Sequence, residues 1–348
     1  MKAIKAYAAL SAEKPLEPWQ IDRREPGSDD VEIEILFSGV CHSDIHTARN
    51  EWRGTVYPVV PGHEIVGKVT RVGNAVSRFK IGDNVGVGCF VDSCRQCRNC
   101  KDDQEQYCEN GHTQTYNSYS QDRKTITHGG YSSHIVVTQH FVLNVSDKLP
   151  LANVAPLLCA GITTYSPLKH WNVKKGDKLA VLGLGGLGHM AVKIASSMGA
   201  EVTVLSRSKT KEKDAARLGA KHFKITSDPE NMKNLAGSFD FIIDTVSAEH
   251  DYNQYLALLR TNGVMVLLGA PPTPSAVSAF PLIGGRRSLV GSLVGGIKET
   301  QEMLDYCADH NISSDIELIN MNQINEAYQR TLAGDVHYRF VIDMKSLN

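Results

Sequence analysis

The sequence lacks a long apolar run, an excess of charge of either sign, any internal repeat and any low-complexity tract. Without a stretch of about 20 apolar residues it offers no membrane span, and residues 1–10 lack the apolar core of a signal peptide. The 37 basic and 38 acidic residues leave a formal net charge of -1, which gives no electrostatic reason to bind nucleic acid or an anionic membrane. We therefore expect a cytoplasmic protein that binds neither.

The chain is long enough for two domains. It has 348 residues, 42% of them hydrophobic and 22% charged, which is an ordinary globular balance. Up to about residue 150 the pattern is of short strands between glycine turns, with strands expected at 31–37, 65–72 and 84–90. This pattern is typical of a small barrel or sandwich.

A different pattern follows residue 150, where strands alternate with helices. We expect strands at 178–182, 201–205, 239–244, 263–268 and 289–293, and helices at 186–198 and 209–218. Such alternation predicts an α/β domain with a parallel, doubly wound sheet. The tail shows helical patterns at 298–310 and 323–333 and a strand at 338–344, and we expect it to pack back on the first domain. The expected domains are residues 1–152 with 297–348, and residues 153–296.

A glycine-rich turn lies between the strand at 178–182 and the helix at 186–198. Its residues fit the G-x-G-x-x-G pattern, in the order Gly183, Leu184, Gly185, Gly186, Leu187 and Gly188. The first glycine allows a tight turn, the second lets a pyrophosphate approach the backbone, and the third allows close packing of helix and strand. The helix N-terminus then offers N–H groups to phosphate oxygens. A glycine turn without a ligand is the alternative, and the flanking strand and helix argue against it.

The residues after the second strand bear on the choice of cofactor. Sites for NAD usually carry Asp or Glu about 20 residues after the first glycine, to bind the ribose hydroxyls. This chain instead has Ser206, Arg207 and Lys211, and no carboxylate before Glu212. Hydroxyls and cations suit a 2′-phosphate, so we expect NADP(H). A solvated helix start is the alternative, although cations are unfavourable at a helix N-terminus.

Four of the eight cysteines lie within fifteen residues. Cys94, Cys97, Cys100 and Cys108 can close a tetrahedron of thiolates around Zn²⁺, as structural zinc sites do. An iron–sulfur cluster is the rival, but the bacterial ferredoxin pattern has three residues before its fourth cysteine and a proline after it. Here seven residues intervene and Glu109 follows, which favours zinc.

Ligands for a second, catalytic metal are scattered. Cys41 follows the alternating strand, His63 and Glu64 precede the next one, and Cys159 lies in an apolar stretch. Catalytic zinc takes three protein ligands and keeps one open position. Taken singly, each residue has an ordinary explanation, because cysteine is often buried and histidine often occurs in turns. Spacing alone therefore leaves this site open.

The order of these residues resembles the zinc-containing medium-chain dehydrogenase/reductase superfamily. Within it the chain is similar to the cinnamyl alcohol dehydrogenase family, especially its bacterial broad-range aldehyde reductases. The similarity spans nearly the whole chain, and its segments are GVCHSDIH (39–46), YPVVPGHEIVGKV (57–69), GDNVGVG (82–88), the four-cysteine loop, PLLCAGITTYSPL (156–168), VLGLGGLGHMAVK (181–193), GSLVGG (291–296) and YRFVID (338–343).

The resemblance implies a GroES-like β-barrel catalytic domain, a Rossmann domain, and roles for individual residues. Cys41, His63 and Cys159 would bind catalytic zinc, with Glu64 beside the metal as an occasional ligand. Asp44 would orient His63, and Ser43 and His46 would form the proton relay. The four cysteines would bind structural zinc. The cofactor would be held by Thr163, Gly183, Gly185, Gly186, Leu187, Gly188, Ser206, Arg207, Lys211 and Arg339, the last of these at the pyrophosphate.

The implied activity is hydride transfer between NADP(H) and a primary alcohol or its aldehyde, aliphatic or aromatic, by a homo-oligomer of two or four copies. The chain departs from the plant enzymes in carrying Gln114 in place of a bulky aromatic and Arg207 in place of a serine. Two alternatives are an NAD-linked polyol or other secondary-alcohol dehydrogenase, and a non-catalytic zinc or nucleotide-binding protein. Cys89 and Cys307 have no sequence context that suggests a role.

Overall fold

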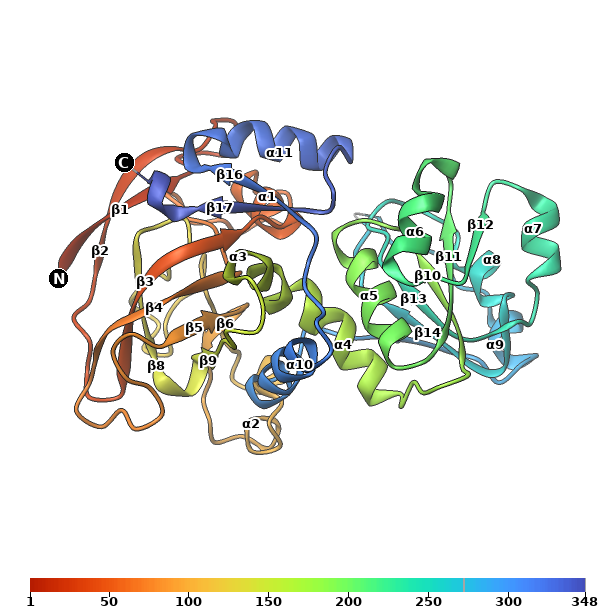
Figure 1. Ribbon diagram of the computed structural model, residues 1–348, viewed down its shortest axis with the longest axis horizontal. Coiled ribbons are helices and arrows are strands. Elements are labelled where there is room, and N and C mark those ends of the chain that lie inside the picture. Colours follow the sequence, from red (N-terminus) through yellow and green to blue (C-terminus); the bar gives the residue numbers. More distant parts are fainter. Residues whose placement is uncertain (272, 348) are drawn as a thin grey trace. The chain divides into compact units, whose positions relative to one another are not determined.

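The computed structural model describes residues 1–271 and 273–347, and the chain divides into two compact units (Figure 1). The first unit is Met1–Ile162 with Gly295–Asn348, and the second is Thr163–Val294. The sequence placed the first boundary at 152/153. In the structure residues 153–162 pack with the first unit, because η3 (Ala155–Leu158) contacts four strands of its sheet.

The first unit is built mainly from strands. Its main sheet has the order β16-β17-β3-β4-β5-β9, with β8 also paired to β3, and β1–β2 and β6–β7 form separate pairs. The strands are β1 (Lys2–Ala8), β2 (Glu17–Arg23), β3 (Asp30–Gly39), β4 (Ile65–Val72), β5 (Asn84–Val87), β6 (Phe90–Asp92), β7 (Thr113–Gln114), β8 (His134–Thr138), β9 (Leu143–Asn144), β16 (Ile316–Asn320) and β17 (Arg339–Asp343).

Short helices join these strands, and two longer ones come from the tail. They are α1 (His42–Ala48), α2 (Arg98–Lys101), η1 (Glu105–Tyr107), η2 (Gln139–Phe141), α3 (Leu151–Val154), η3, α10 (Ile297–Asp309), η5 (Met321–Gln323), α11 (Ile324–Ala333) and η6 (Met344–Ser346). The tail returns to the N-terminal part because β17 pairs antiparallel with β3, with Val341 opposite Gly39.

Between Val31 and Ile35 the alternation of β3 follows burial, with one exception. Val31, Ile33 and Ile35 are buried and Glu34 is exposed, as a half-buried strand requires. Glu32 is buried as well, and it pairs with cations at the sheet surface: Lys2 Nζ lies 3.3 Å and an Arg71 nitrogen 3.2 Å from its carboxylate.

The expected strand at 84–90 is two strands. β5 ends at Val87, and β6 begins at Phe90 and pairs with β7 instead. The chain crosses closely over η3 at this point, because a Cβ on Gly88 would lie 3.1 Å from the carbonyl oxygen of Leu158. Close approach of two backbones explains why the ladder is interrupted.

The second unit holds a six-stranded parallel sheet among the described residues, with order β12-β11-β10-β13-β14-β15. Its strands are β10 (Lys178–Leu182), β11 (Glu201–Ser206), β12 (His222–Ile225), β13 (Phe239–Asp244), β14 (Leu259–Leu267) and β15 (Ser288–Gly291). Its helices are α4 (Ala160–His170), which begins in the first unit, α5 (Gly186–Ser197), η4 (Lys209–Lys211), α6 (Glu212–Leu218), α7 (Pro229–Asn234), α8 (Tyr252–Leu256) and α9 (Ala279–Ile283).

The centre of this sheet is apolar on both faces. Leu179, Ala180 and Val181 of β10 are fully buried, as expected for a parallel strand covered on each side. Figure 1 shows α5 and α6 running beside these strands. Two expectations shift slightly: the helix expected from residue 209 starts as a 3₁₀ turn and becomes α-helical at Glu212, and the last strand ends at Gly291.

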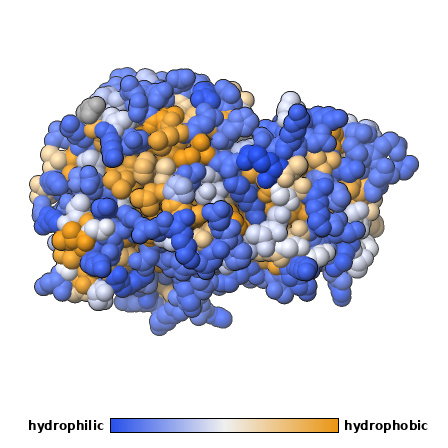
Figure 2. Space-filling model, in the orientation of Figure 1, coloured by the Kyte–Doolittle hydropathy of each residue, from blue (hydrophilic) through white to orange (hydrophobic). Residues whose placement is uncertain are grey.

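Polar side chains cover most of the face shown in Figure 2, and apolar ones gather over β16 and β17. β16 is the edge strand of the first unit's sheet and carries the exposed Leu318. Among the described residues, no helix has the length and apolar character needed to cross a lipid bilayer.

Candidate metal centres and active site

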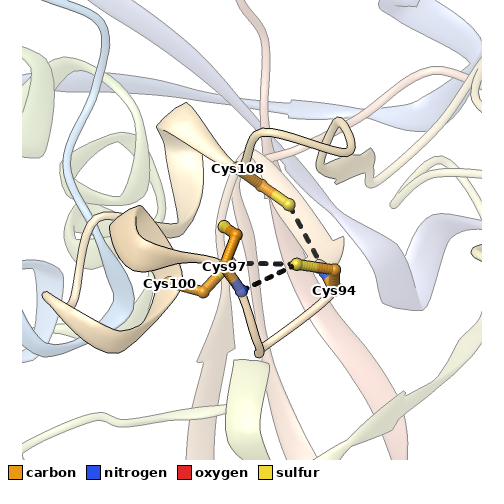
Figure 3. Close-up of side chains that lie close together, drawn as sticks. All are labelled: Cys94, Cys97, Cys100 and Cys108. Carbon is orange, nitrogen blue, oxygen red and sulfur yellow. Dashed lines mark hydrogen bonds between the residues drawn. The ribbon is translucent and has the colours of Figure 1, made fainter.

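The four cysteines of the 94–108 loop point toward a common centre (Figure 3). Their Sγ atoms all lie within 4.8 Å of one another, and Cys94 and Cys100 are 3.9 Å apart. A Zn–S bond of about 2.3 Å in a tetrahedron requires sulfur atoms about 3.8 Å apart. The spacing therefore fits one zinc ion with four thiolate ligands.

Local structure brings these thiols together. Cys97 precedes α2, Cys100 lies within it, and Cys108 follows η1. Backbone N–H groups already point at the sulfurs: Cys97 N donates to Cys94 Sγ at 3.3 Å, and Cys94 N donates to Cys108 Sγ at 3.4 Å. These N–H groups would stabilise the negative charge of thiolates bound to a metal ion.

The thiols of this loop do not ionise alike without a metal. Backbone N–H donors lower the pKa of Cys94 to about 6, whereas burial raises the pKa of Cys100 to about 12. A cation at the centre would stabilise all four thiolates. The loop is also fastened to the tail, because the buried Glu105 accepts a hydrogen bond from Ile297 N at 3.1 Å.

A second set of ligand atoms lies in the first unit. Cys41, His63, Glu64 and Cys159 each offer one atom within 4.8 Å of the others, and the Sγ atoms of Cys41 and Cys159 are 4.0 Å apart. Cys41 lies just before α1, His63 and Glu64 just before β4, and Cys159 just before α4. The structure thus brings together residues that are far apart in the sequence.

Asp44 explains how two of these ligands are held. It is the third residue of α1, and its Oδ2 accepts the N–H of Cys41 at 2.9 Å, which caps the helix. Its Oδ1 accepts from Gly62 N and from His63 Nδ1, both at 3.1 Å. Asp44 therefore fixes the segment that carries His63 and leaves Nε2 of that ring available for a metal ion.

Gly62 allows the segment that carries His63 to pass close to the backbone of Gly130. Its φ is +105°, a conformation that favours glycine, and a Cβ would lie 2.8 Å from Gly130 N. Because a side chain cannot be accommodated here, the position before His63 requires glycine.

Glu64 lies between the ligand set and a buried arginine. Arg339, the first residue of β17, donates to Glu64 Oε1. Oε2 of Glu64 is buried and has no hydrogen-bond partner among the described residues. A buried carboxylate oxygen without a partner is costly, so a nearby metal ion would fit the donor set. Arg339 is only 6% exposed, and the neighbouring carboxylate and thiolates raise its pKa against the effect of burial.

The charges of this centre are strongly perturbed. The hydrogen bond from Cys159 lowers the pKa of Cys41 well below its usual value and raises that of Cys159. Burial raises the pKa of Glu64 to about 7. Burial opposes protonation of His63, but the Asp44 carboxylate outweighs it and raises the pKa of that ring. Two sulfurs, an imidazole and a free corner are a donor set typical of catalytic zinc.

The two expected relay residues lie on α1 next to this centre. Cys41 Sγ lies 3.6 Å from Ser43 Oγ, and His46 follows one turn later on the helix. His46 Nδ1 contacts the carboxylate of Glu51, and its ring stacks on Trp52 with centroids 4.9 Å apart. Glu51 and Trp52 were not identified from the sequence, because their role depends on the turn after α1.

The glycine-rich turn has the expected geometry. Gly183 has a φ of +86°, and a Cβ on Gly188 would lie 2.2 Å from Gly183 O. A Cβ on Gly185 would meet nothing within 4 Å, so the backbone at the start of α5 is open to a ligand. Gly186 and Leu187 form the first turn of α5, where free N–H groups can bind phosphate.

The residues that follow β11 include one that contacts this turn within the second unit. Ser206 ends the strand and Arg207 is exposed. Lys211 is half-buried, and its amine donates to Leu184 O of the glycine turn at 2.8 Å. Burial lowers the pKa of Lys211. Two cations and a hydroxyl thus lie where the carboxylate of an NAD site is expected.

The remaining candidates take varied positions. Thr163 is buried in α4. Cys89 lies beside the Cys159 segment, with its Sγ 3.7 Å from Leu158 O. Cys307 is fully buried in α10 and contacts Met303 Sδ at 3.7 Å. Gln114 of β7 is exposed.

Two family models match the chain. Residues 27–147 match the alcohol dehydrogenase GroES-like domain, and residues 186–309 match the zinc-binding dehydrogenase family. These matches confirm the expected fold class: a GroES-like N-terminal domain and a parallel Rossmann-like sheet.

Curated relatives match over the full length. The chain is 58% identical over 348 residues to NADP-dependent alcohol dehydrogenase C 1 of Mycolicibacterium smegmatis, covering 100% of this chain and 99% of the relative. It is 54% identical over 346 residues to aldehyde reductase YahK of Escherichia coli, covering 99% of each.

Solved structures of the same family are also similar to this chain. A cinnamyl alcohol dehydrogenase of Sorghum bicolor has a TM-score of 0.96 and 46% identity, covering 99% of this chain and 98% of that one. A cinnamyl alcohol dehydrogenase of Helicobacter pylori, solved with NADP(H), has a TM-score of 0.93 and 47% identity over the same shares. The chain therefore belongs to the cinnamyl-alcohol-dehydrogenase-like family of the zinc-containing medium-chain dehydrogenase/reductase superfamily.

Proposed function

We propose that this protein is a zinc-dependent alcohol dehydrogenase, or aldehyde reductase, that transfers hydride between NADP(H) and a primary alcohol or aldehyde. The observation that carries the proposal is the convergence of Cys41, His63 and Cys159, with the buried and partly unpaired Glu64, on one point. This donor set fits Zn²⁺ and leaves a position for a substrate oxygen. The names of the relatives at 54–58% identity support the same activity.

Two bound groups, a zinc ion and the nicotinamide cofactor, would supply the central chemistry. Bound zinc would act as a Lewis acid on the substrate oxygen, and the nicotinamide would give or accept the hydride. The residues of the chain would bind the zinc ion, orient its ligands and move protons. Cys41 and Cys159 offer sulfur, Asp44 holds His63 with Nε2 free, and Glu64 is the carboxylate available as an occasional further ligand.

Ser43 and His46 would move the proton. The Ser43 hydroxyl lies 3.6 Å from Cys41 Sγ, and His46 lies one turn further along α1. In aldehyde reduction the imidazolium of His46 gives a proton toward Ser43, and the alcohol oxygen receives one from the serine hydroxyl. Histidine suits this task because its ordinary pKa lies near 6.5. Glu51, in contact with His46 Nδ1, would hold the orientation of this ring.

The second unit would hold NADP(H). Gly183, Gly185, Gly186, Leu187 and Gly188 would receive the pyrophosphate at the start of α5. Ser206, Arg207 and Lys211 would bind the 2′-phosphate, because cations and a hydroxyl replace the carboxylate of an NAD site. We also assign Thr163 to the nicotinamide side and Arg339 to the pyrophosphate, as the family resemblance implies.

The four-cysteine loop would hold a structural zinc ion, which gives two ions per chain. The eight cysteines form no disulfide in the part of the chain that the structure describes, and six of them lie in the two metal centres, which suits the reducing cytoplasm. We expect a homo-oligomer of two or four copies. Phe280 and Ile283 of α9 are 84% and 75% exposed, which is unusual for the surface of a monomer.

The test is an assay with NADPH and NADH at equal concentration on a panel of aliphatic and aromatic aldehydes. We expect NADPH-dependent reduction of both kinds of aldehyde. A clear preference for NADH would contradict the cofactor assignment and favour an NAD-linked polyol or other secondary-alcohol dehydrogenase. A protein that binds zinc and NADPH but reduces no aldehyde and oxidises no alcohol would support the non-catalytic alternative.

A further inference from the structure

The Asp44 carboxylate receives four hydrogen-bond donors. Oδ1 accepts from Gly62 N and His63 Nδ1, and Oδ2 accepts from Cys41 N at 2.9 Å and from the Tyr131 hydroxyl at 3.3 Å. The side chain is fully buried, so water does not compete for these positions. An ionised carboxylate has about four lone-pair sites, and these four donors fill them.

Tyr131 is locked in place from both ends. It is fully buried, its N–H donates to Pro61 O at 2.9 Å, and its carbonyl accepts from Tyr7 N at 2.8 Å. Next to it, Gly130 N donates to Gly62 O at 2.8 Å. The backbone around Tyr131 is therefore bonded to the segment that leads into His63, while its side chain reaches the carboxylate that orients His63.

Two of these donors are side chains, His63 and Tyr131, and the buried Tyr116 hydroxyl also interacts with the carboxylate. The other two donors are the backbone N–H groups of Cys41 and Gly62, which do not depend on the side chain at either position. Burial and the nearby Asp44 charge raise the pKa of Tyr131 well above its ordinary value, so the hydroxyl keeps its proton and remains a donor.

We propose that Tyr131 is a positioning residue for the catalytic metal centre, acting through Asp44 to hold the His63 ring with Nε2 toward the thiols of Cys41 and Cys159. The proposal rests on the proposed function, since it assumes that a metal ion binds there. Without the hydroxyl, Oδ2 of Asp44 would lose the donor that Tyr131 provides, and the carboxylate and the ring bonded to it would be freer to shift.

The test is Tyr131→Phe, which removes one oxygen and keeps the ring that fills the core. We expect zinc to be held about tenfold more weakly at this centre, the lower end of the effect of removing a partner of a metal-bound histidine. The readout is zinc transfer to a chromophoric chelator, measured on the whole chain without substrate. A His63→Ala sample, which lacks this centre, identifies the phase that belongs to the four-cysteine loop.

Two further variants separate positioning from general loss of stability. Tyr57→Phe is the matched control, because the Tyr57 hydroxyl donates to Ala48 O at 2.9 Å on the same helix, α1, without touching Asp44. We expect it to leave zinc release unchanged. In an Asp44→Asn background, Tyr131→Phe should add little, because the carboxylate through which it acts is gone.

Zinc release from Tyr131→Phe at the wild-type rate would overturn the inference, as would equal weakening by Tyr57→Phe. Either result leaves the proposed function standing if the wild-type enzyme binds two zinc ions and reduces aldehydes. A wild-type chain that binds a single zinc ion, in the four-cysteine loop, would overturn both.

Discussion

Arg207 is an exposed cation directly after Ser206, at the end of the strand where dinucleotide folds select between the two nicotinamide cofactors. An exposed side chain here contributes little to the fold, so its substitution tests cofactor binding separately from stability. The same is true of the neighbouring exposed residues of η4 and α6.

Arg207→Ser should raise the KM for NADPH about tenfold and leave the KM for NADH nearly unchanged. The reason is the loss of a charged hydrogen bond to the 2′-phosphate, which typically contributes about 1.5–3 kcal/mol. Steady-state kinetics with both cofactors measures the effect. Lys213→Ser, an exposed cation on α6, is the matched control. Equal losses with NADPH and NADH would refute the assigned role of Arg207.

His128 makes stability depend on pH. Its Nδ1 is buried without a hydrogen-bond partner among the described residues, and burial together with Arg23 lowers its pKa to about 4. The ordinary value is about 6.5. Between these values the unfolded chain binds the proton more readily than the folded one, so this contribution destabilises the fold as pH falls from 6.5 toward 4.

His128→Gln should remove that dependence. Denaturant unfolding at several pH values should show the variant gaining stability relative to the wild type as pH falls from 6.5 toward 4, with no such trend between pH 7 and 8. A difference between the two proteins that is independent of pH across this range would rule out the assignment to His128.

The sequence predicted the ligands of one metal centre more directly than those of the other. The spacing of the four loop cysteines alone predicts a metal site, because four thiols within fifteen residues can reach one ion. Cys41 and His63 are 22 positions apart and His63 and Cys159 are 96 apart, and only the family resemblance connected them. Tyr131 gave no signal, because nothing in its local sequence shows that its hydroxyl reaches Asp44.

Among the elements, the four-cysteine loop depends most on its metal ion. α2 and η1 are too short to be stable alone, and few apolar side chains of the loop are buried. Cross-linking by zinc would replace the missing core. The loop also carries Glu105, which bonds to the first residue of α10, so disorder of the loop would loosen the return of the tail.

Cys97→Ser should release the structural zinc and lower the apparent Tm by more than about 4 °C, the shift that about 1 kcal/mol produces at most in a domain of 150–250 residues. Turnover per folded molecule at low temperature should fall much less. Scanning calorimetry and metal analysis measure the two effects. Lys101→Ser, exposed in the same loop, should match the wild type. A Cys97→Ser protein with two zinc ions and an unchanged Tm would contradict the structural role.

Strong periodicity made some elements predictable. β4, β10 and β13 have the expected bounds. β10 is the clearest case, because its four residues from Leu179 to Leu182 are all apolar. The strand expected at 84–90 broke in two, because contact with η3 outweighs the local pattern there. β12 was missed, since its four residues are exposed or only half-buried and carry little apolar signal.

Across the whole molecule the two kinds of site belong to different units. Both metal centres lie in the first unit, and the glycine turn with Ser206, Arg207 and Lys211 lies in the second. The tail contributes Arg339 to the first unit through β17, which no local motif requires. Metal binding by the first unit and cofactor binding by the second should therefore be separable by substitution.

The most direct test of the account is to measure zinc content and NADPH-dependent aldehyde reduction on the same samples of the wild type and of His63→Ala. We predict two zinc ions per wild-type chain with turnover, and one zinc ion, no turnover and unchanged NADPH binding for His63→Ala. A His63→Ala protein that reduces aldehydes at near the wild-type rate would contradict the central claim that this histidine holds the catalytic metal ion.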